Sequence, residues 1–264
     1  NALGEKENEK ASYFLAQSII LATLTAVIVS IAGIYLGPSI ILLMNDSYLT
    51  MKLSMEYLNI IFLGSIFVFI QMAVNSSLSA MGDTKTNRNV LIFSFFLNIV
   101  LNPLFIFGYW FIPAMGMKGI AISTVISQGL GTSYIIYKAT LTDLSKYLYL
   151  NCFKPRIKIL LDLLKQGIPA SIGMMMISVG VFIILFFIGQ YGDLALAGYG
   201  TAIRYEQLFL LPVLGLNTAV LSMVGQNFGA KKLIRVNQIY NKSLLFGCIF
   251  MFFSGFVIFF TAEY

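Results

Sequence analysis

The stretch that decides the fold covers residues 11–45 and reads ASYFLAQSIILATLTAVIVSIAGIYLGPSIILLMN, without a single charged residue. A helix needs about 20 apolar residues to cross roughly 30 Å of hydrocarbon. This stretch exceeds that length, and uninterrupted apolar runs of this kind are typical of transmembrane helices rather than of buried helices in soluble proteins. We therefore expect a membrane-spanning helix here.

Six further charge-free stretches follow along the chain. They cover residues 57–82, 89–117, 119–137, 166–192, 207–230 and 243–262. The whole sequence is 58% hydrophobic and only 11% charged, whereas soluble domains carry about 25% charged residues. The sequence predicts an all-α, polytopic membrane protein with seven transmembrane helices.

The positive charges are divided unequally between the two ends of these stretches. If every stretch crosses the membrane, fourteen of the 17 Lys and Arg residues lie on one side, and only Lys52, Lys118 and Arg204 lie on the other. Cytoplasmic loops carry the excess of Lys and Arg. We expect a multi-pass protein of the cell membrane with its N-terminus in the cytoplasm and its C-terminus outside. The cations form no long basic run, so we expect no nucleic-acid partner.

The longest polar interval, residues 138–165, holds six Lys or Arg residues and Pro155. It divides the chain into residues 1–138, a cytoplasmic connector over residues 139–165, and residues 166–264. Within the connector, apolar residues recur at helical spacing at positions 157, 160, 161 and 164. This spacing predicts a short amphipathic helix over residues 157–165, lying along the cytoplasmic membrane surface.

A weak internal repeat extends the prediction beyond the chain. ALGEK at residues 2–6 corresponds to NFGAK at residues 227–231, with Gly229 placed 225 residues after Gly4. Six helices separate the copies, so both have the same orientation, as in the parallel repeats of some transporters. We expect two helices before Asn1 and three after Tyr264, twelve in all, with this chain as a fragment.

Several motifs resemble the multidrug and toxic compound extrusion (MATE) transporters, in the order that this family has them. They are AMGDTKT (80–86), NxxxNPLFIFG (98–108), PxxGxxGIAIST (113–124), GYG followed by RxE (198–206) and VGQNFGA (224–230). The resemblance covers essentially the whole chain and assigns its helices as the third to ninth of twelve. It implies two six-helix lobes around a cavity. It also implies Na⁺- or H⁺-coupled antiport of organic, often cationic, drugs and toxic compounds by alternating access, with no cofactor beyond the coupling ion.

Asn98 and Asn102 lie four residues apart and share a helix face. Pro103 frees the carbonyl one turn back, and hard cations prefer such oxygen ligands. Thr124 lies about 8 Å from the outer end of the next helix. Asn102 lies about 18 Å from the cytoplasmic end of its own helix, so the two residues reach nearly the same depth in the membrane. These residues either join helices by hydrogen bonds or bind a cation. The resemblance implies a Na⁺ or H⁺ site at Asn98, Asn102 and Thr124, with an acid from a helix before Asn1.

Other residues are candidates for substrate contact or for hinges. The expected cavity residues are Gln71, Asn75, Met175 with its neighbours Met174 and Met176, Arg204 and Glu206, and the expected hinge residues are Pro103, Pro212 and Gly215. Each also has a plainer role, as a polar contact between helices, a headgroup anchor, a lipid-facing side chain or a tolerated kink. Ile177 stands where some MATE transporters have a Glu, so we expect no second carboxylate site of that kind.

Three other classes of protein fit the sequence less well. A seven-helix receptor would have its N-terminus outside. An intramembrane enzyme would need a nucleophile and a base, but the chain has no His and no such constellation. A lipid-linked sugar flippase of similar two-lobe plan would need several cations in its cavity, where Arg204 is the only candidate. The two cysteines, Cys152 and Cys248, are not expected to pair. We expect a monomeric transporter whose partners are the lipid bilayer and small organic substrates.

Overall fold

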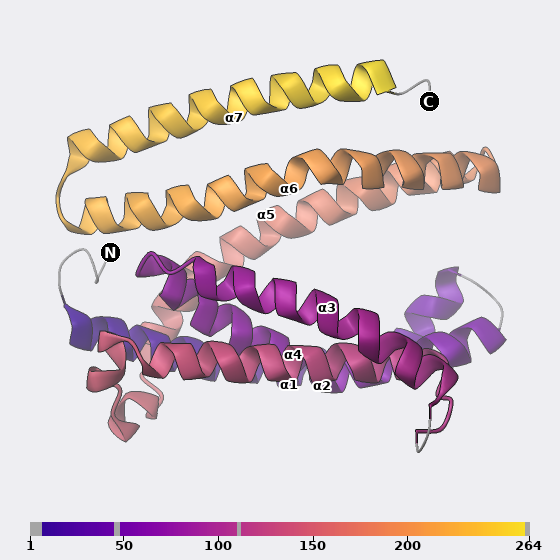
Figure 1. Ribbon diagram of the computed structural model, residues 1–264, viewed down its shortest axis with the longest axis horizontal. Coiled ribbons are helices and arrows are strands. Elements are labelled where there is room, and N and C mark those ends of the chain that lie inside the picture. The colour runs from indigo at the N-terminus through magenta and orange to yellow at the C-terminus, as the bar shows by residue number, and fades with distance from the viewer. Residues whose placement is uncertain (1–6, 45–47, 110–111, 262–264) are drawn as a thin grey trace. The chain divides into compact units, whose positions relative to one another are not determined.

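The computed structural model describes residues 7–44, 48–109 and 112–261, and this part of the chain is almost entirely helical (Figure 1). The long helices are α1 (Asn8–Met44), α2 (Tyr48–Ala80), α3 (Lys85–Phe107), α4 (Met117–Thr140), α5 (Ile157–Gly189), α6 (Asp193–Gly229) and α7 (Leu233–Thr261). Two short 3₁₀ helices, η1 (Asp143–Tyr147) and η2 (Leu150–Phe153), lie between α4 and α5.

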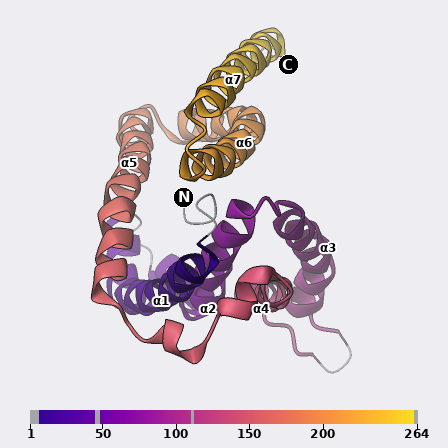
Figure 2. The same cartoon turned by 90° about the vertical axis from the view of Figure 1, so that its left-hand side faces the viewer.

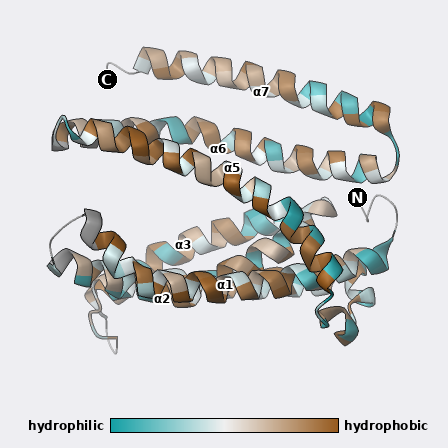
Figure 3. Ribbon diagram, turned by 180° about the vertical axis from the view of Figure 1, so that it is seen from behind, coloured by the Kyte–Doolittle hydropathy of each residue, from teal (hydrophilic) through white to brown (hydrophobic). Residues whose placement is uncertain are grey.

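All seven long helices are long and apolar enough to cross a membrane, as the sequence predicted. Hydrophobic residues cover most of their length (Figure 3). In α5 and α6 the most apolar 18-residue windows bury none of their residues within the structure. Such surfaces are stable in lipid, because hydrocarbon chains cover apolar side chains and the helices satisfy their own backbone hydrogen bonds.

The chain forms two compact units, one over Glu7–Leu160 and the other from Leu161 onward. Residues 157–165 are helical, but the prediction of a separate amphipathic helix there is wrong. They form the first turns of α5, which continues unbroken through Pro169 to Gly189. A transmembrane helix tolerates such a proline, because local adjustments satisfy the single carbonyl that it frees.

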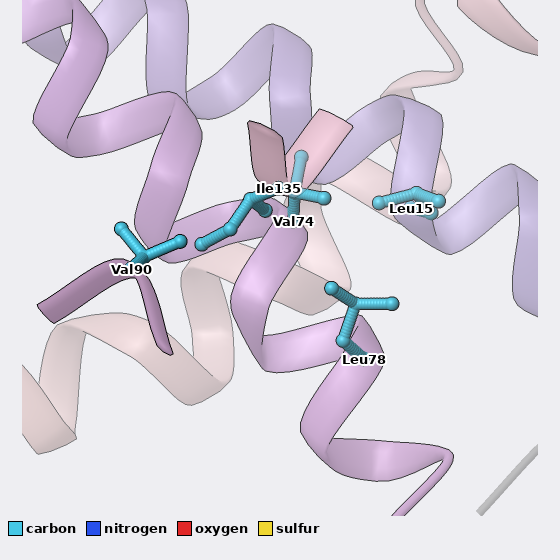
Figure 4. Close-up of a cluster of buried hydrophobic side chains, with 5 residues drawn as sticks. All are labelled: Leu15, Val74, Leu78, Val90 and Ile135. Carbon is cyan, nitrogen blue, oxygen red and sulfur yellow. The ribbon is translucent and has the colours of Figure 1, made fainter. Parts of the chain in front are cut away.

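In the Glu7–Leu160 unit, α1 packs on α2, α2 on α4, and α4 on α3 (Figure 2). α4 therefore lies between α2 and α3. Five buried side chains join all four helices, as Figure 4 shows: Leu15, Val74, Leu78, Val90 and Ile135. This cluster holds the end of the unit at which α1 begins and α4 ends.

Small residues let the helices of this unit approach closely. A Cβ atom added to Gly33 of α1 would meet the ring of Phe62 on α2, and one added to Gly64 of α2 would meet Val125 on α4. Beside Gly33, the Ser30 hydroxyl donates to the Phe62 carbonyl at 2.5 Å. Close packing of this kind and interhelical hydrogen bonds hold membrane helices together, because lipid removes most of the hydrophobic drive between them.

The turn from α2 to α3 lies in the AMGDTKT motif. Gly82 takes a φ of +90°, which L side chains rarely adopt, and the N–H of Asp83 reaches back to the Leu78 carbonyl at 2.9 Å. The Asp83 carboxylate then accepts the backbone N–H and the hydroxyl of Thr86, at 3.0 and 2.5 Å. These bonds cap the first turn of α3, and the hydroxyl bond above all lowers the pKa of Asp83 below its usual range.

This cap makes part of the stability pH-dependent. Because folding lowers the pKa of Asp83, its contribution is complete above the unfolded-state pKa of about 3.9 and is lost as pH falls through the folded-state pKa. We expect Asp83→Ala to reduce the free energy of unfolding by about 1 kcal/mol at pH 7. Thermal unfolding at pH 7 and pH 3 measures this, and the difference from wild type should shrink at pH 3. Asp162→Ala, at an exposed position of α5, is the control; an equal loss there would contradict the cap.

The segment between α4 and α5 is folded onto α1 rather than free. Gln17 of α1 is completely buried. Its Nε2 donates to the carbonyls of Cys152 and Lys154 at 2.8 and 2.9 Å, and its Oε1 accepts the N–H of Arg156 at 2.9 Å. Nearer the start of α1, Ser12 donates to the Leu144 carbonyl at 2.9 Å. We call this set of bonds from Gln17 the Gln17 clamp.

Gln17→Leu should release the clamp. The substitution removes three hydrogen bonds, and it leaves the buried Cys152 carbonyl without this partner; an unpaired buried group costs about 1–3 kcal/mol. The thiol of Cys152, which the folded connector buries completely, should then react with a soluble maleimide many times faster in a Cys248→Ser background. Lys154→Gln is the matched control, because Gln17 contacts only the backbone of Lys154. Unchanged labelling in Gln17→Leu would argue against the clamp.

In the second unit, α6 and α7 pack on each other, and the Tyr205 and Thr261 hydroxyls share a hydrogen bond of 2.6 Å. The NFGAK copy of the repeat forms the turn between these helices. Lys231 takes a φ of +57°, and the N–H of Lys232 bonds back to the Asn227 carbonyl at 2.9 Å. The ALGEK copy, residues 2–6, lies outside the described residues.

Candidate functional site

The two asparagines of α3 lie one turn apart on the side of the helix that meets α4. Asn102 Oδ1 accepts a hydrogen bond from the hydroxyl of Ser123 on α4. Asn98 Nδ2 donates to the Ser94 carbonyl at 2.9 Å. Asn98 Oδ1 is buried, and no residue of the described part donates a hydrogen bond to it. A buried amide oxygen without a hydrogen-bond donor costs free energy and is available to a ligand.

Gly119 brings the two helices together at this point. A Cβ atom built there would lie 2.5 Å from the Phe105 carbonyl oxygen of α3. The loop between the two helices also contacts α3 at this point, since the N–H of Met115 donates to the Phe105 carbonyl at 2.9 Å. Ser123 is one turn after Gly119 on the same helix face, so the close approach directs its hydroxyl to Asn102.

The structure pairs Ser123 with Asn102, and Thr124 bonds within its own helix. The Thr124 hydroxyl donates to the Ile120 carbonyl at 2.9 Å. Ser123 is fully buried, and sequence reasoning missed it. The sequence feature that indicates Ser123 is the spacing of Gly119, Ser123 and Ser127, three small residues at intervals of four that share one face of α4.

A second group of polar side chains lies further along α4, and Gly131 provides the space for it. A Cβ atom there would lie 2.7 Å from Val90, 3.4 Å from Gln71 Oε1 and 3.5 Å from Ser94 Oγ. The adjacent Thr132 hydroxyl is 3.3 Å from Gln71 Oε1 and 2.9 Å from the Phe67 carbonyl. Polar groups of α2, α3 and α4 thus meet inside the membrane-spanning part of the unit.

The remaining candidates have different surroundings. Asn75, one turn after Gln71, has a buried Oδ1 without a donor among the described residues. Pro103 follows Asn102 within α3, which continues to Phe107. Candidates of the second unit lie on exposed helix surface, namely Met174, Met175 and Met176 on α5 and Arg204, Glu206, Pro212 and Gly215 on α6.

The ligand atoms that this site offers are uncharged. The described residues contain no group of three His, Cys, Asp or Glu side chains placed to hold a metal ion. A cation at Asn98 and Asn102 would instead meet amide, hydroxyl and carbonyl oxygens, which suit a hard ion such as Na⁺. The structure places Ser123, rather than the predicted Thr124, beside Asn102, and a cation site at Asn98 and Asn102 stays a prediction.

The chain matches the family model described as MatE over residues 1–104 and 169–264. It is 34% identical over 219 residues to the probable multidrug resistance protein YpnP of Bacillus subtilis (strain 168), covering 83% of this chain and 48% of that protein. It is 29% identical over 267 residues to the probable multidrug resistance protein NorM of Thermotoga maritima, covering 100% of this chain and 56% of NorM.

Solved structures show the same fold. An outward-facing MATE family transporter of the MOP superfamily superimposes with a TM-score of 0.85 at 22% identity, over 99% of this chain and 58% of that one. The chain thus spans about half the length of the curated relatives that it matches.

Proposed function

The chain belongs to the MatE family, and from that premise we propose that it forms part of an antiporter that exports organic, often cationic, compounds. Inward flow of Na⁺ or H⁺ drives the export, and the protein alternates between inward-open and outward-open states as a monomer. Family membership favours a transporter over the seven-helix receptor and the intramembrane enzyme, and the names of both relatives refer to multidrug resistance.

The observation that carries the ion-coupling proposal is the unpaired Oδ1 of Asn98, one turn from the bond between Asn102 and Ser123. A Na⁺ ion at this level would take oxygen ligands from both asparagines and from the carbonyl of Ile99, which Pro103 leaves without its helical N–H donor. An acid from a helix outside this chain completes the site in our proposal. Each positive charge that moves inward supplies roughly 2.3 kcal/mol per 100 mV of membrane potential.

Efflux of a cationic dye by the full-length protein in proteoliposomes tests the proposal. We expect efflux when either a Na⁺ or a proton gradient is imposed, and the gradient that works identifies the coupling ion. An ionophore that dissipates the effective gradient should stop the efflux. Dye movement that no ion gradient changes would contradict coupling.

The proposed topology, with the start of α1 in the cytoplasm, has its own test. Native Cys152 is unsuitable as a probe because it is completely buried. Asp143→Cys places a thiol where the native side chain is 82% exposed. In a Cys152→Ser, Cys248→Ser background, we expect an impermeant thiol reagent to label this variant in inverted vesicles and not in intact cells. Labelling in intact cells would reverse the orientation.

A further inference from the structure

The connector between α4 and α5 runs along α1 toward the membrane-spanning part of that helix. Lys10, in the first turn of α1, is exposed and pairs with Glu7 at 2.9 Å. Tyr13 and Gln17 lie on one face of the charge-free stretch that follows. At 1.5 Å per residue, Gln17 is about 10 Å further along the axis than Lys10. Since Gln17 binds the backbone of Cys152, Lys154 and Arg156, η2 is held beside the beginning of the charge-free stretch of α1.

The outer surface of this connector combines apolar and aromatic side chains. Leu150 is 91% exposed and Tyr149 63%, although the neighbouring Cys152 is completely buried. At the edge of a bilayer such residues are favourable, since aromatic rings and aliphatic chains lie there between headgroups and hydrocarbon.

Two cations next to η2 are not offset by an acid. Asp143, the one acidic residue of the segment over residues 141–156, pairs with Lys146 at 2.7 Å. Lys154 and Arg156 are exposed and form no ion pair in the described part of the chain. The Arg156 guanidinium lies over the ring of Tyr13, 3.7 Å from its centroid. This stacking orients the guanidinium, whose N–H edges match a phosphate group.

We propose that η2 and the residues after it bind the headgroup of an anionic phospholipid. Arg156 and Lys154 contact the lipid phosphate at the level of Tyr13, and Tyr149 and Leu150 lie among the upper acyl chains. The partner is a lipid of the surrounding bilayer rather than a soluble anion, because the cations and the apolar side chains occupy one segment at the membrane boundary.

Native mass spectrometry of the purified full-length protein, titrated with dioleoyl phosphatidylglycerol, tests this site. We expect Arg156→Gln to weaken binding of the tightest lipid roughly fivefold, the effect typical of one cation near a membrane surface. Lys146→Gln removes the same charge from a lysine already paired with Asp143 and should bind as wild type does. The Gln17 clamp persists in Arg156→Gln, because Gln17 contacts only the backbone N–H of that residue; equal melting temperatures verify this.

Two further titrations distinguish a phospholipid site from a general affinity for lipid or for phosphate. Phosphatidylcholine should bind wild type and Arg156→Gln equally, and inorganic phosphate should not displace phosphatidylglycerol. Unchanged phosphatidylglycerol binding in Arg156→Gln would overturn the proposal, and so would displacement by inorganic phosphate. These measurements need no ion gradient or transport substrate, so their outcome is independent of the proposed export function.

The depth of η2 gives a second, independent readout. A nitroxide at Leu150→Cys, in a Cys152→Ser, Cys248→Ser background and phosphatidylglycerol bilayers, should be relaxed more by oxygen than by a water-soluble nickel complex. The matched label at Asp143→Cys should show the reverse order. A label at position 150 that responds mainly to the nickel complex would contradict insertion.

Discussion

Asn102→Leu is expected to reduce ion-driven dye efflux to the level of protein-free vesicles while leaving the amount of folded protein in the membrane unchanged. Leu is a side chain of comparable length to Asn, but it lacks the oxygen that accepts the Ser123 hydroxyl and that would face the ion. The fold tolerates this change, because the Ser123 hydroxyl keeps the Ile120 carbonyl as an acceptor at 2.8 Å. Efflux from proteoliposomes under the effective gradient, normalised to reconstituted protein, measures the loss.

Two matched variants serve as controls for this result. Asn89→Leu makes the same change on α3 at an exposed position near the helix start and should transport as wild type does. Asn102→Asp keeps an oxygen acceptor for Ser123 and should retain ion-driven efflux. Wild-type efflux from Asn102→Leu would remove Asn102 from the mechanism.

Gly119→Ala should be among the most destabilising single-methyl changes in the Glu7–Leu160 unit. The added Cβ would lie 2.5 Å from the Phe105 carbonyl oxygen, 2.6 Å from its carbon and 3.0 Å from the Ile106 nitrogen. These atoms belong to the backbone of α3, so no side-chain rotation relieves the overlap and the helices must separate. Overpacking of this kind costs about 1–3 kcal/mol, and Gly119→Val should cost more.

Gly129→Ala is the control for this prediction, on the same helix. Its Cβ would lie 3.8 Å from the Phe67 ring, an ordinary contact, and alanine favours a helix over glycine by roughly 0.5–1 kcal/mol. Thermal unfolding in detergent should give a lower melting temperature for Gly119→Ala and an unchanged or higher one for Gly129→Ala. Equal melting temperatures would show that α3 and α4 do not approach each other closely at Gly119.

The spans were the part of the fold that could be predicted most directly. A membrane helix is recognisable from its composition over about 20 residues, and no tertiary contact is needed to identify it. Residues 157–165 show the limit of such patterns. Their apolar spacing is helical, but spacing alone does not say whether a helix ends before Gly167 and Pro169, and the structure continues it to Gly189.

For the candidate site, the sequence indicated residue types and approximate depth. Asn98 and Asn102 were identifiable because two amides and a proline within one turn are unusual inside an apolar helix. Ser123 was not distinguishable from Thr124, since neighbouring hydroxyls reach similar depths and differ only in the direction they face. That direction depends on the rotation of α4 against α3, which the contact at Gly119 sets.

Membrane insertion, the number of crossings and the family could all be derived from the order of residues, because each depends on composition or on motifs local in the chain. The partners of Asn102 and Gln17 could not. Ser123 is 21 residues from Asn102, and the backbone groups that Gln17 binds lie 135 to 139 residues away from it. Pairings at such separations result from helix packing and from the need of every buried polar group for a partner, and the three-dimensional arrangement alone determines which groups meet.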